Sequence, residues 1–172
     1  MSNEQNGANW AQDGLETRLR TVERVANGAF PLVGTTAGGN AVAGTVGEYQ
    51  EVAVLVGAAV SLSTGVVANV ASMSLTAGDW DLNGIVSYHS ATGTTAPNDV
   101  LQGISTTSAT VGAQGTFSYD YVAVAITDDP SYVAPVVRVN IAATTTVYLV
   151  TKSDFAVSTL TAYGFMRARR IR

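Results

Sequence analysis

The segment best suited to bind a metal ion is Asp79-Trp80-Asp81-Leu82-Asn83-Gly84. Oxygen-bearing side chains at alternate positions, with glycine sixth, match the first half of an EF-hand calcium loop. The second half does not match, because Ser90 stands at the twelfth position, where a bidentate glutamate completes the coordination. The alternative is a strand in which Trp80 and Leu82 enter a core, Asp79 and Asp81 face water, and Asn83-Gly84 form a bulge or bend. We favour this second interpretation and predict no metal site.

His89 is the only histidine, so it is the one imidazole available as a general base. A strand residue is the simpler interpretation, because His89 follows Tyr88 in an alternating segment. The neighbouring Ser87 and Ser90 lack the Gly-x-Ser-x-Gly context of a nucleophile elbow. The absence of cysteine excludes a thiol nucleophile, a disulfide and a thiolate metal site.

Paired carboxylates occur at Asp79/Asp81 and at Asp128/Asp129. A glycosidase needs two such groups on opposite sides of a cleft. Asp128-Asp129-Pro130 is instead typical of a tight turn, in which aspartate bonds the backbone and proline fixes φ. We therefore expect no enzyme activity, no catalytic residues and no cofactor.

Aromatic side chains leave a binding function open, because they stack on sugars and also fill subunit contacts. The aromatic residues that could serve either purpose are Trp10, Tyr49, Tyr119, Tyr121, Tyr132 and Tyr163.

The composition predicts a subunit whose surface is partly covered by other subunits. Of the 172 residues, 47% are apolar but only 13% are charged, about half the share in an ordinary soluble domain. Such a surface protects a lone monomer poorly against association. The longest apolar stretch, near Val52 to Val60, is too short for a membrane span, so we expect no membrane insertion.

The charges are segregated along the chain. Two basic and nine acidic residues lie between Val25 and Met166, a net charge of −7. Because phosphate binding requires a basic face, this acidic body argues against a nucleic-acid partner. The basic residues at Arg167, Arg169, Arg170 and Arg172 are expected to pair with an acidic protein surface.

A helix is predicted from Asp13 to Gly28, with Asp13 and Glu16 as a capping box and Asn27-Gly28 as its end. The apolar spacing within it is that of a coiled-coil seam, formed by Leu15, Leu19, Val22 and Ala26. A helix of this length must pack on something. We expect it to pack on copies of itself, the alternative being a helix packed on the sheet or on a neighbouring protein.

The remainder divides into an arm and a β-domain. Glycine, threonine and alanine from Phe30 to Gly47 indicate an extended arm. Short alternating runs then predict strands near residues 49–56, 58–63, 68–75, 80–89, 100–108, 117–127, 134–142, 145–151 and 159–168. Strands at this spacing indicate a sandwich or barrel rather than a parallel sheet with crossover helices. Of these we predict an all-β, antiparallel, jelly-roll-like sandwich of about eight strands. The predicted division is thus 1–47 for attachment and oligomerisation and 48–172 for the β-sandwich head.

Four ordered blocks resemble a domain of virion structural proteins from tailed bacteriophages. They run from Leu75 to Gly84, from Gly103 to Thr110, from Thr145 to Val150 and from Val157 to Arg172. The resemblance covers roughly Gly44 to Arg172. It implies a β-sandwich that trimerises on fibres, spikes or capsid decorations and that carries no catalytic residues to transfer.

Together these observations predict a non-enzymatic, homotrimeric virion surface appendage, a capsid decoration or head-fibre protein. The alternative is a tail-fibre or spike tip that binds a host-surface glycan or receptor through loops near Ala91 to Asn98 and Thr127 to Tyr132. The expected partners are its own copies and phage capsid or tail proteins, the latter through the N-terminal segment. Because the first ten residues are polar, without a secretory signal pattern, we expect assembly in the host bacterial cytoplasm and final residence in the virion.

Overall fold

The structure is a computed structural model that describes residues 14–20, 38–90, 96–122, 128–156 and 159–172. The chain divides into two compact units, Met1–Gly39 and Asn40–Arg172. In the first unit, residues 14–20 form a helix whose seven residues are all exposed. No helix within the described ranges is long and apolar enough to cross a membrane.

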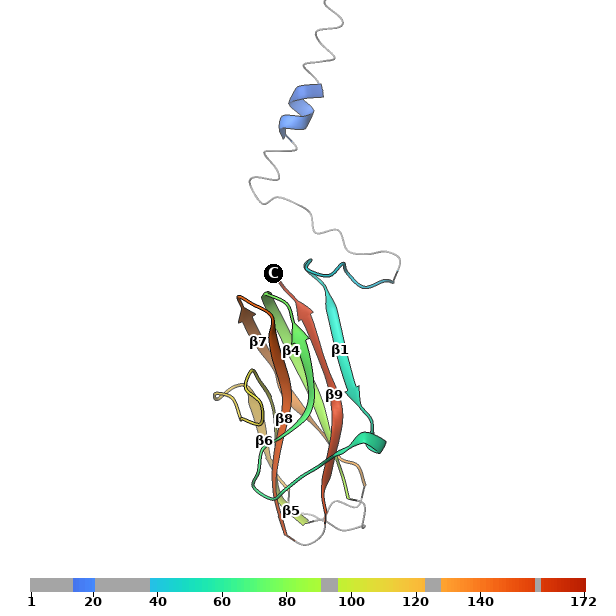
Figure 1. The fold of residues 1–172 in the computed structure, drawn as a ribbon, viewed down its shortest axis with the longest axis vertical. Coiled ribbons are helices and arrows are strands. Elements are labelled where there is room, and N and C mark those ends of the chain that lie inside the picture. The colour runs from blue at the N-terminus through green and yellow to red at the C-terminus, as the bar shows by residue number, and fades with distance from the viewer. Residues whose placement is uncertain (1–13, 21–37, 91–95, 123–127, 157–158) are drawn as a thin grey trace, which may run out of the picture. The chain divides into compact units, whose positions relative to one another are not determined.

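The described part of the second unit is built from nine strands, which Figure 1 shows as two layers. Their bounds are β1 Tyr49–Val54, β2 Val60–Ser61, β3 Ala68–Leu75, β4 Gly78–His89, β5 Ala96–Ser105, β6 Phe117–Tyr121, β7 Ser131–Ile141, β8 Thr145–Ala156 and β9 Thr161–Arg170. A 3-10 turn, η1, spans Val56–Ala58. One sheet has the order β1-β9-β4-β7, with β2 also on β9, and the other has the order β3-β8-β5-β6.

The strand pairing is nested, as in a jelly roll. The first strand pairs with the last (β1 with β9), β3 pairs with β8, β4 with β7 and β5 with β6, all antiparallel. Two further pairings, β4 with β9 and β5 with β8, join these ribbons into two sheets. The predicted all-β sandwich is therefore confirmed, and its order is that of an eight-stranded jelly roll with one additional short strand.

Local sequence explains the strands. In β7, Val137, Val139 and Ile141 turn inward while Arg138 and Asn140 are exposed, which is the period-two alternation of a half-buried strand. Pro135 lies in this same strand, and it is tolerated because β7 is at the edge of its sheet. The register of β4 on β7 does shift between Leu82 and Gly84, but two residues of β7, Pro135 and Val136, stand there opposite Asn83 alone, so the extra residue lies in β7 and not in the predicted Asn83-Gly84 segment.

A hydrophobic core lies between the sheets. Its largest fully buried members are Trp80, Tyr88, Leu75, Leu82, Ile104, Leu149, Leu160 and Met166. The part of the core beside β5 also holds polar groups. The Tyr88 hydroxyl lies 2.6 Å from Thr151 Oγ1, and Gln102 Nε2 donates to Asp120 Oδ2 at 2.8 Å. Within the described residues every buried side-chain nitrogen or oxygen has a partner, so these polar groups stay compatible with burial.

Some predicted strand bounds were wrong. The strand predicted at 58–63 is reduced to Val60–Ser61, because Val56–Ala58 form the 3-10 turn. The strand predicted at 145–151 continues to Ala156, and the one predicted at 100–108 begins at Ala96 and ends at Ser105. Strand β6 ends at Tyr121, and residues 123–127 of its predicted extension lie outside the described residues.

Candidate functional site

Asp79 is buried by an arginine pair, which corrects the prediction that it faces water. Trp80 and Leu82 do enter the core, as predicted. Asp79 is 3% exposed, and both of its carboxylate oxygens are occupied. Arg138 Nε donates to Asp79 Oδ1 at 2.8 Å and Arg172 Nε donates to Asp79 Oδ2 at 2.9 Å. These two guanidinium groups, with Arg138 first, lower the pKa of Asp79 to about 2.

This occupancy also bears on the calcium hypothesis. A calcium loop needs the aspartate oxygens for the metal, whereas the oxygens of Asp79 serve two arginines. Within the described residues no group of three or more acidic or histidine side chains could hold a metal ion. The segment is therefore a strand with a structural aspartate.

Arg170 is buried beside Asp79 at the end of β9. Its Nε donates to Glu48 Oε2 at 2.9 Å, its Nη1 donates to Ala77 O at 2.7 Å, and its Cζ lies 4.3 Å from the centroid of the Trp80 ring. A β-carbon at Gly78 would overlap this guanidinium, so glycine is required there. Arg170 and Arg172 thus pair with acidic groups of their own domain.

Glu48 is held in its charged form inside this cluster. Its burial raises its pKa, but hydrogen bonds from the Gly44 N–H, from Gln50 and from Arg170 outweigh the burial and lower the pKa below its usual value. The cluster closes the domain where the arm enters, because Gly47 N also donates to Arg170 O at 2.9 Å. The contacts of Arg170 and Glu48 therefore serve to stabilise the fold.

His89 lies at the end of β4, as the strand interpretation predicted. Its Nδ1 is 2.7 Å from Asp129 Oδ1, and the Tyr163 hydroxyl donates to Asp129 Oδ2 at 3.0 Å. The hydrogen bond from His89 lowers the pKa of Asp129. A histidine oriented by a carboxylate is one part of a catalytic triad, but the nearby Ser87 Oγ is bonded to Ser131 Oγ at 2.6 Å. Ser87 is thus bonded to Ser131 and not to His89.

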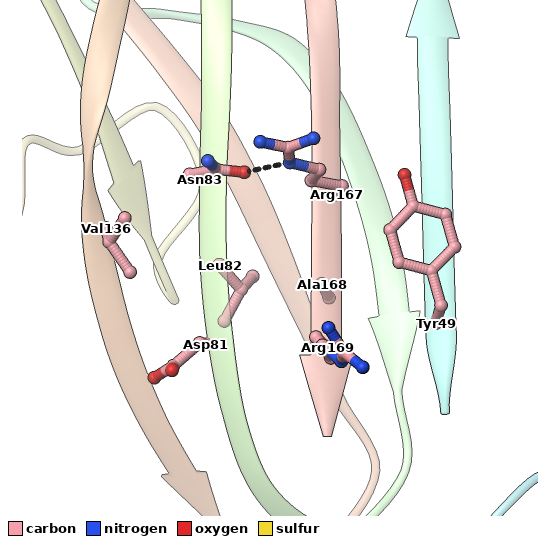
Figure 2. A pocket seen from close by; sticks show the side chains of 8 residues that line it. All are labelled: Tyr49, Asp81, Leu82, Asn83, Val136, Arg167, Ala168 and Arg169. Carbon is pink, nitrogen blue, oxygen red and sulfur yellow. Dashed lines mark hydrogen bonds between the residues drawn. The ribbon is translucent and has the colours of Figure 1, made fainter. Parts of the chain in front are cut away.

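An open groove of about 350 Å³ crosses the outer face of the β1-β9-β4-β7 sheet. Figure 2 shows its lining, which comes from β1, β4, β7 and β9 and consists of Tyr49, Asp81, Leu82, Asn83, Val136, Arg167, Ala168 and Arg169. Arg167 Nε donates to Asn83 Oδ1 at 2.7 Å. The groove offers the positive charges of Arg167 and Arg169 for a carboxylate or phosphate group, and Asp81 is the one carboxylate in its lining.

Two tyrosines stand on the outer face of the other sheet. Tyr119 is 57% exposed and Tyr121 is 77% exposed, and both belong to β6. The Tyr119 hydroxyl donates to Asp99 Oδ2 at 2.5 Å, and this bond raises the pKa of Tyr119. Of the other aromatic candidates, Tyr49, Tyr132 and Tyr163 are partly buried, and Trp10 lies outside the described residues. Of the predicted glycan-binding loops, residues 91–95 and 127 lie outside the described residues, whereas residues 96–98 belong to β5 and Ser131 and Tyr132 belong to β7.

The predicted helix seam is only partly visible. Leu15 and Leu19 lie on the helix of residues 14–20 and are 65% and 61% exposed. Val22 and Ala26 lie outside the described residues. The structure thus presents two leucines one helical turn apart with most of their surface uncovered.

Sequence reasoning missed the partners of Asp79 and His89. Arg138 and Arg172 are 59 and 93 residues away from Asp79, and Asp129 is 40 residues away from His89. Only the nested strand pairing brings these residues together. The alternation of Arg138 with Val137 and Val139 placed it on the outer face. The register sets Arg138 directly opposite Asp81, whereas its bonded partner Asp79 lies two residues away along β4, so strand pairing alone does not identify that partner.

Comparison with known proteins gives no family. No family model and no curated protein matches the chain. A solved structure of the VP2 subviral particle of infectious bursal disease virus aligns with 83% of this chain and 38% of its own chain, at 12% identity and a TM-score of 0.42. The T13 viral particle of the same virus aligns with 83% of this chain and 36% of its own chain, at 11% identity and a TM-score of 0.43. The chain spans well under half of these proteins, and the similarity is too distant to transfer a function.

Proposed function

We propose that this chain is a non-enzymatic structural protein of a tailed-phage virion. In this proposal it is a homotrimeric surface appendage, a capsid decoration or head-fibre protein. The four sequence blocks that resemble phage virion domains support the virion role. The low share of charged residues supports a surface that is shielded by neighbouring subunits.

The observation that carries the oligomeric part is the exposure of Leu15 and Leu19. A helix of the predicted length, Asp13 to Gly28, is marginal in water without a packed apolar face. Two leucines at this spacing form such a face, and a parallel bundle of identical helices would bury it. The helix then joins the copies, while the β-domains form the outer heads.

Light scattering on the purified full chain at micromolar concentration tests the oligomer. We expect the mass of three copies for the natural sequence and a lower mass for the double variant Leu15→Ser/Leu19→Ser. Arg20→Gln is the matched control, because it changes an exposed residue of the same helix outside the leucine seam. A natural chain that is a monomer under these conditions would contradict the homotrimer.

Electron microscopy with a labelled antibody tests the position on the particle. Label distributed over the capsid supports the decoration or head-fibre role, whereas label confined to the tail supports a tail-fibre role. Absence of label from intact particles that contain the rest of the virion proteins would contradict a virion role.

The second candidate function is a tail-fibre or spike tip that binds a host-surface glycan. The exposed pair Tyr119 and Tyr121 favours it, because neighbouring aromatic rings on one face of a strand can stack on sugar rings. A glycan array should then show binding that Tyr119→Ala/Tyr121→Ala abolishes and that Tyr49→Ala, on the opposite sheet, leaves unchanged. Equal binding by both variants would exclude this surface.

A further inference from the structure

A free strand edge lines one side of a second groove in the β-domain. Strand β7 forms an edge of its sheet (Figure 1). The groove, of about 360 Å³, has two walls, one formed by residues 137–140 of β7 and the other by the end of β5 and the loop after it, between Ile104 and Thr116. Side chains of a strand alternate between its two faces. Because four consecutive residues of β7 line the groove, it runs along the edge of the strand and not over one face.

The strand register determines which main-chain groups of β7 point toward this edge. The Asp79 N–H donates to Arg172 O at 3.1 Å and the Asp79 carbonyl accepts from Ile171 N at 2.8 Å, so the main-chain groups of Asp79 face β9 and not β7. Pairs along an antiparallel ladder alternate between hydrogen-bonded and non-hydrogen-bonded pairs. Asn140, which stands opposite Asp79, and Arg138, two positions before it, therefore direct their N–H and C=O groups away from β4.

The outward N–H and C=O groups of Arg138 and Asn140 have no backbone partner within the described residues. Elsewhere on the same edge the domain provides a partner, because Ser118 Oγ donates to the carbonyl oxygen of Val133 at 2.8 Å. No such bond reaches Arg138 or Asn140 from the described residues of the facing loop. Their main-chain groups are therefore open to the groove, and an exposed row of such groups is a template for pairing with another chain.

The facing wall of the groove is held in place by its own hydrogen bonds. Asn69 of β3 fixes the middle of the loop, because its Nδ2 donates to Ser108 Oγ at 2.8 Å and its Oδ1 accepts from Ala109 N at 2.7 Å. At the end of the loop, Ile104 N donates to Thr116 O at 2.9 Å. The groove is therefore preformed, and a bound segment does not have to order the loop, which lowers the cost of binding.

The side chains that line the groove favour an uncharged segment. Arg138 is the one charged side chain in the lining, and its guanidinium is already bonded to Asp79. Five lining residues carry hydroxyl groups, and these are Ser105, Thr106, Thr107, Thr110 and Thr116. Hydroxyl groups both donate and accept hydrogen bonds. They therefore suit small polar side chains, such as those of serine, threonine or asparagine.

The loop wall leaves room for one extended segment and not for the edge of a second folded sheet. A strand added to β7 lies about 4.8 Å from it, and the loop stands on the far side of that strand. Pro135 limits the pairing toward the start of β7, because proline has no N–H to donate. The described strands of another copy are already paired in their own sheets. The groove thus fits a single extended segment beside residues 137–140.

We propose that the β7 edge at residues 137–140 binds an extended, uncharged segment of another virion protein by strand addition. The inference rests on the proposed virion role. The partial charges are complementary, because the outward N–H and C=O groups of Arg138 and Asn140 meet the C=O and N–H groups of the added segment. Main-chain bonds hold the segment on β7, and the hydroxyl groups of the facing loop contact its side chains.

Hydrogen exchange of the full chain, resolved to single amides by mass spectrometry, tests this contact. The N–H groups of Arg138 and Asn140 should exchange freely in the purified chain and more than about tenfold more slowly when the chain is on the virion. The matched variants are Asn140→Pro and Asn140→Ala, because proline removes the N–H that the segment needs and alanine removes only the side chain. On the virion, Asn140→Pro should lose the protection of the Arg138 N–H, and Asn140→Ala should keep it. Both variants should fold, because the Asn140 N–H is directed away from β4.

The outcomes separate this contact from the proposed function. If the chain is on the virion but both N–H groups exchange there as fast as in the purified chain, strand addition is wrong while the virion role stands. If the chain is absent from the virion, both proposals fail. Slow exchange of both groups already in the purified chain would show that another copy supplies the segment, which overturns a second virion protein as the partner. Protection of Arg138 that persists in Asn140→Pro would overturn the main-chain pairing. If Asn140→Pro does not fold, the exchange of the natural chain on and off the virion decides alone.

Discussion

Replacing Arg170 with methionine should destabilise the β-domain, because it removes one member of a buried ion pair. Arg170 and Glu48 have side chains that are 4% and 7% exposed, and they form a buried ion pair. Methionine would keep much of the volume but remove the positive charge. Glu48 would retain its bonds from Gly44 N and Gln50 Nε2 and lose its counter-charge.

The cost follows from the burial of the remaining charge. Breaking a buried pair by removing one partner costs about 3 to 5 kcal/mol, and losing the cation-π contact with Trp80 adds about 0.5 to 2 kcal/mol. Ala77 and Thr76, the other two groups bonded to Arg170, are exposed, so water can replace their bonds at little cost. We therefore expect a loss of about 4 kcal/mol.

Urea unfolding at fixed protein concentration measures this loss. With a slope of about 2 kcal/mol per molar urea, the midpoint should fall by about 2 M. The double variant Glu48→Gln/Arg170→Met should recover at least about 2 kcal/mol relative to Arg170→Met, because it leaves no buried charge unpaired. A loss below about 1 kcal/mol for Arg170→Met, or no recovery in the double variant, would refute the assignment of this pair as the stabilising closure of the domain.

Three further predictions concern packing, pH and the exposed histidine. Gly164→Ala should lower the free energy of unfolding in urea by about 3 kcal/mol or more, because a β-carbon there overlaps the Ile85 carbonyl in the neighbouring strand. The control Gly57→Ala, whose β-carbon meets no atom, should lower it by under about 0.5 kcal/mol. Equal losses in the two variants would contradict the steric argument. Asp79 has a pKa of about 2 in the folded protein and near 3.8 in the unfolded chain, so its charge stabilises the fold fully above about pH 5. The melting temperature should therefore be constant above about pH 5 and fall between about pH 4 and pH 2. Calorimetry of the Asp79→Asn variant should show a smaller acid-induced fall in melting temperature, and an unchanged fall would show that other groups cause it. His89→Ala should change the free energy of unfolding by less than about 1 kcal/mol, because the side chains of His89 and Asp129 are both more than a third exposed. A larger loss would show that the contact between these two side chains stabilises the sheet.

The strands were predictable where the core side chains are apolar. Strand β7 was predicted from the alternation of Val137, Val139 and Ile141, and these three residues turn inward in the structure. The second half of β8 was missed because its inward positions Thr151 and Ser153 are polar. Ser153 is buried only because its hydroxyl bonds the carbonyl of Asp99 across the sheet, at 2.7 Å, and that partner cannot be read from the local sequence.

The cluster around Asp79 shows what local sequence leaves undetermined. Alternation along β4 places Asp79 opposite Trp80, and therefore on the outer face, which is correct. Burial on that face depends on Arg138 and Arg172, which arrive from β7 and from the end of the chain. A residue can thus face away from the core and still be covered when charged neighbours from distant strands converge on it.

The central position of β9 means that the sheet of β1, β9, β4 and β7 cannot be completed until β9 has been synthesised. Strand β9 lies between β1 and β4, and its end residue Arg170 bonds Glu48, 122 positions earlier in the chain. At about 5 to 20 residues per second, roughly 6 to 24 s separate the synthesis of these two residues. During that interval β1 lacks its sheet neighbour, and β3 also waits for β8. A nascent chain that stalls before β9 therefore exposes unpaired apolar strands to chaperones and proteases.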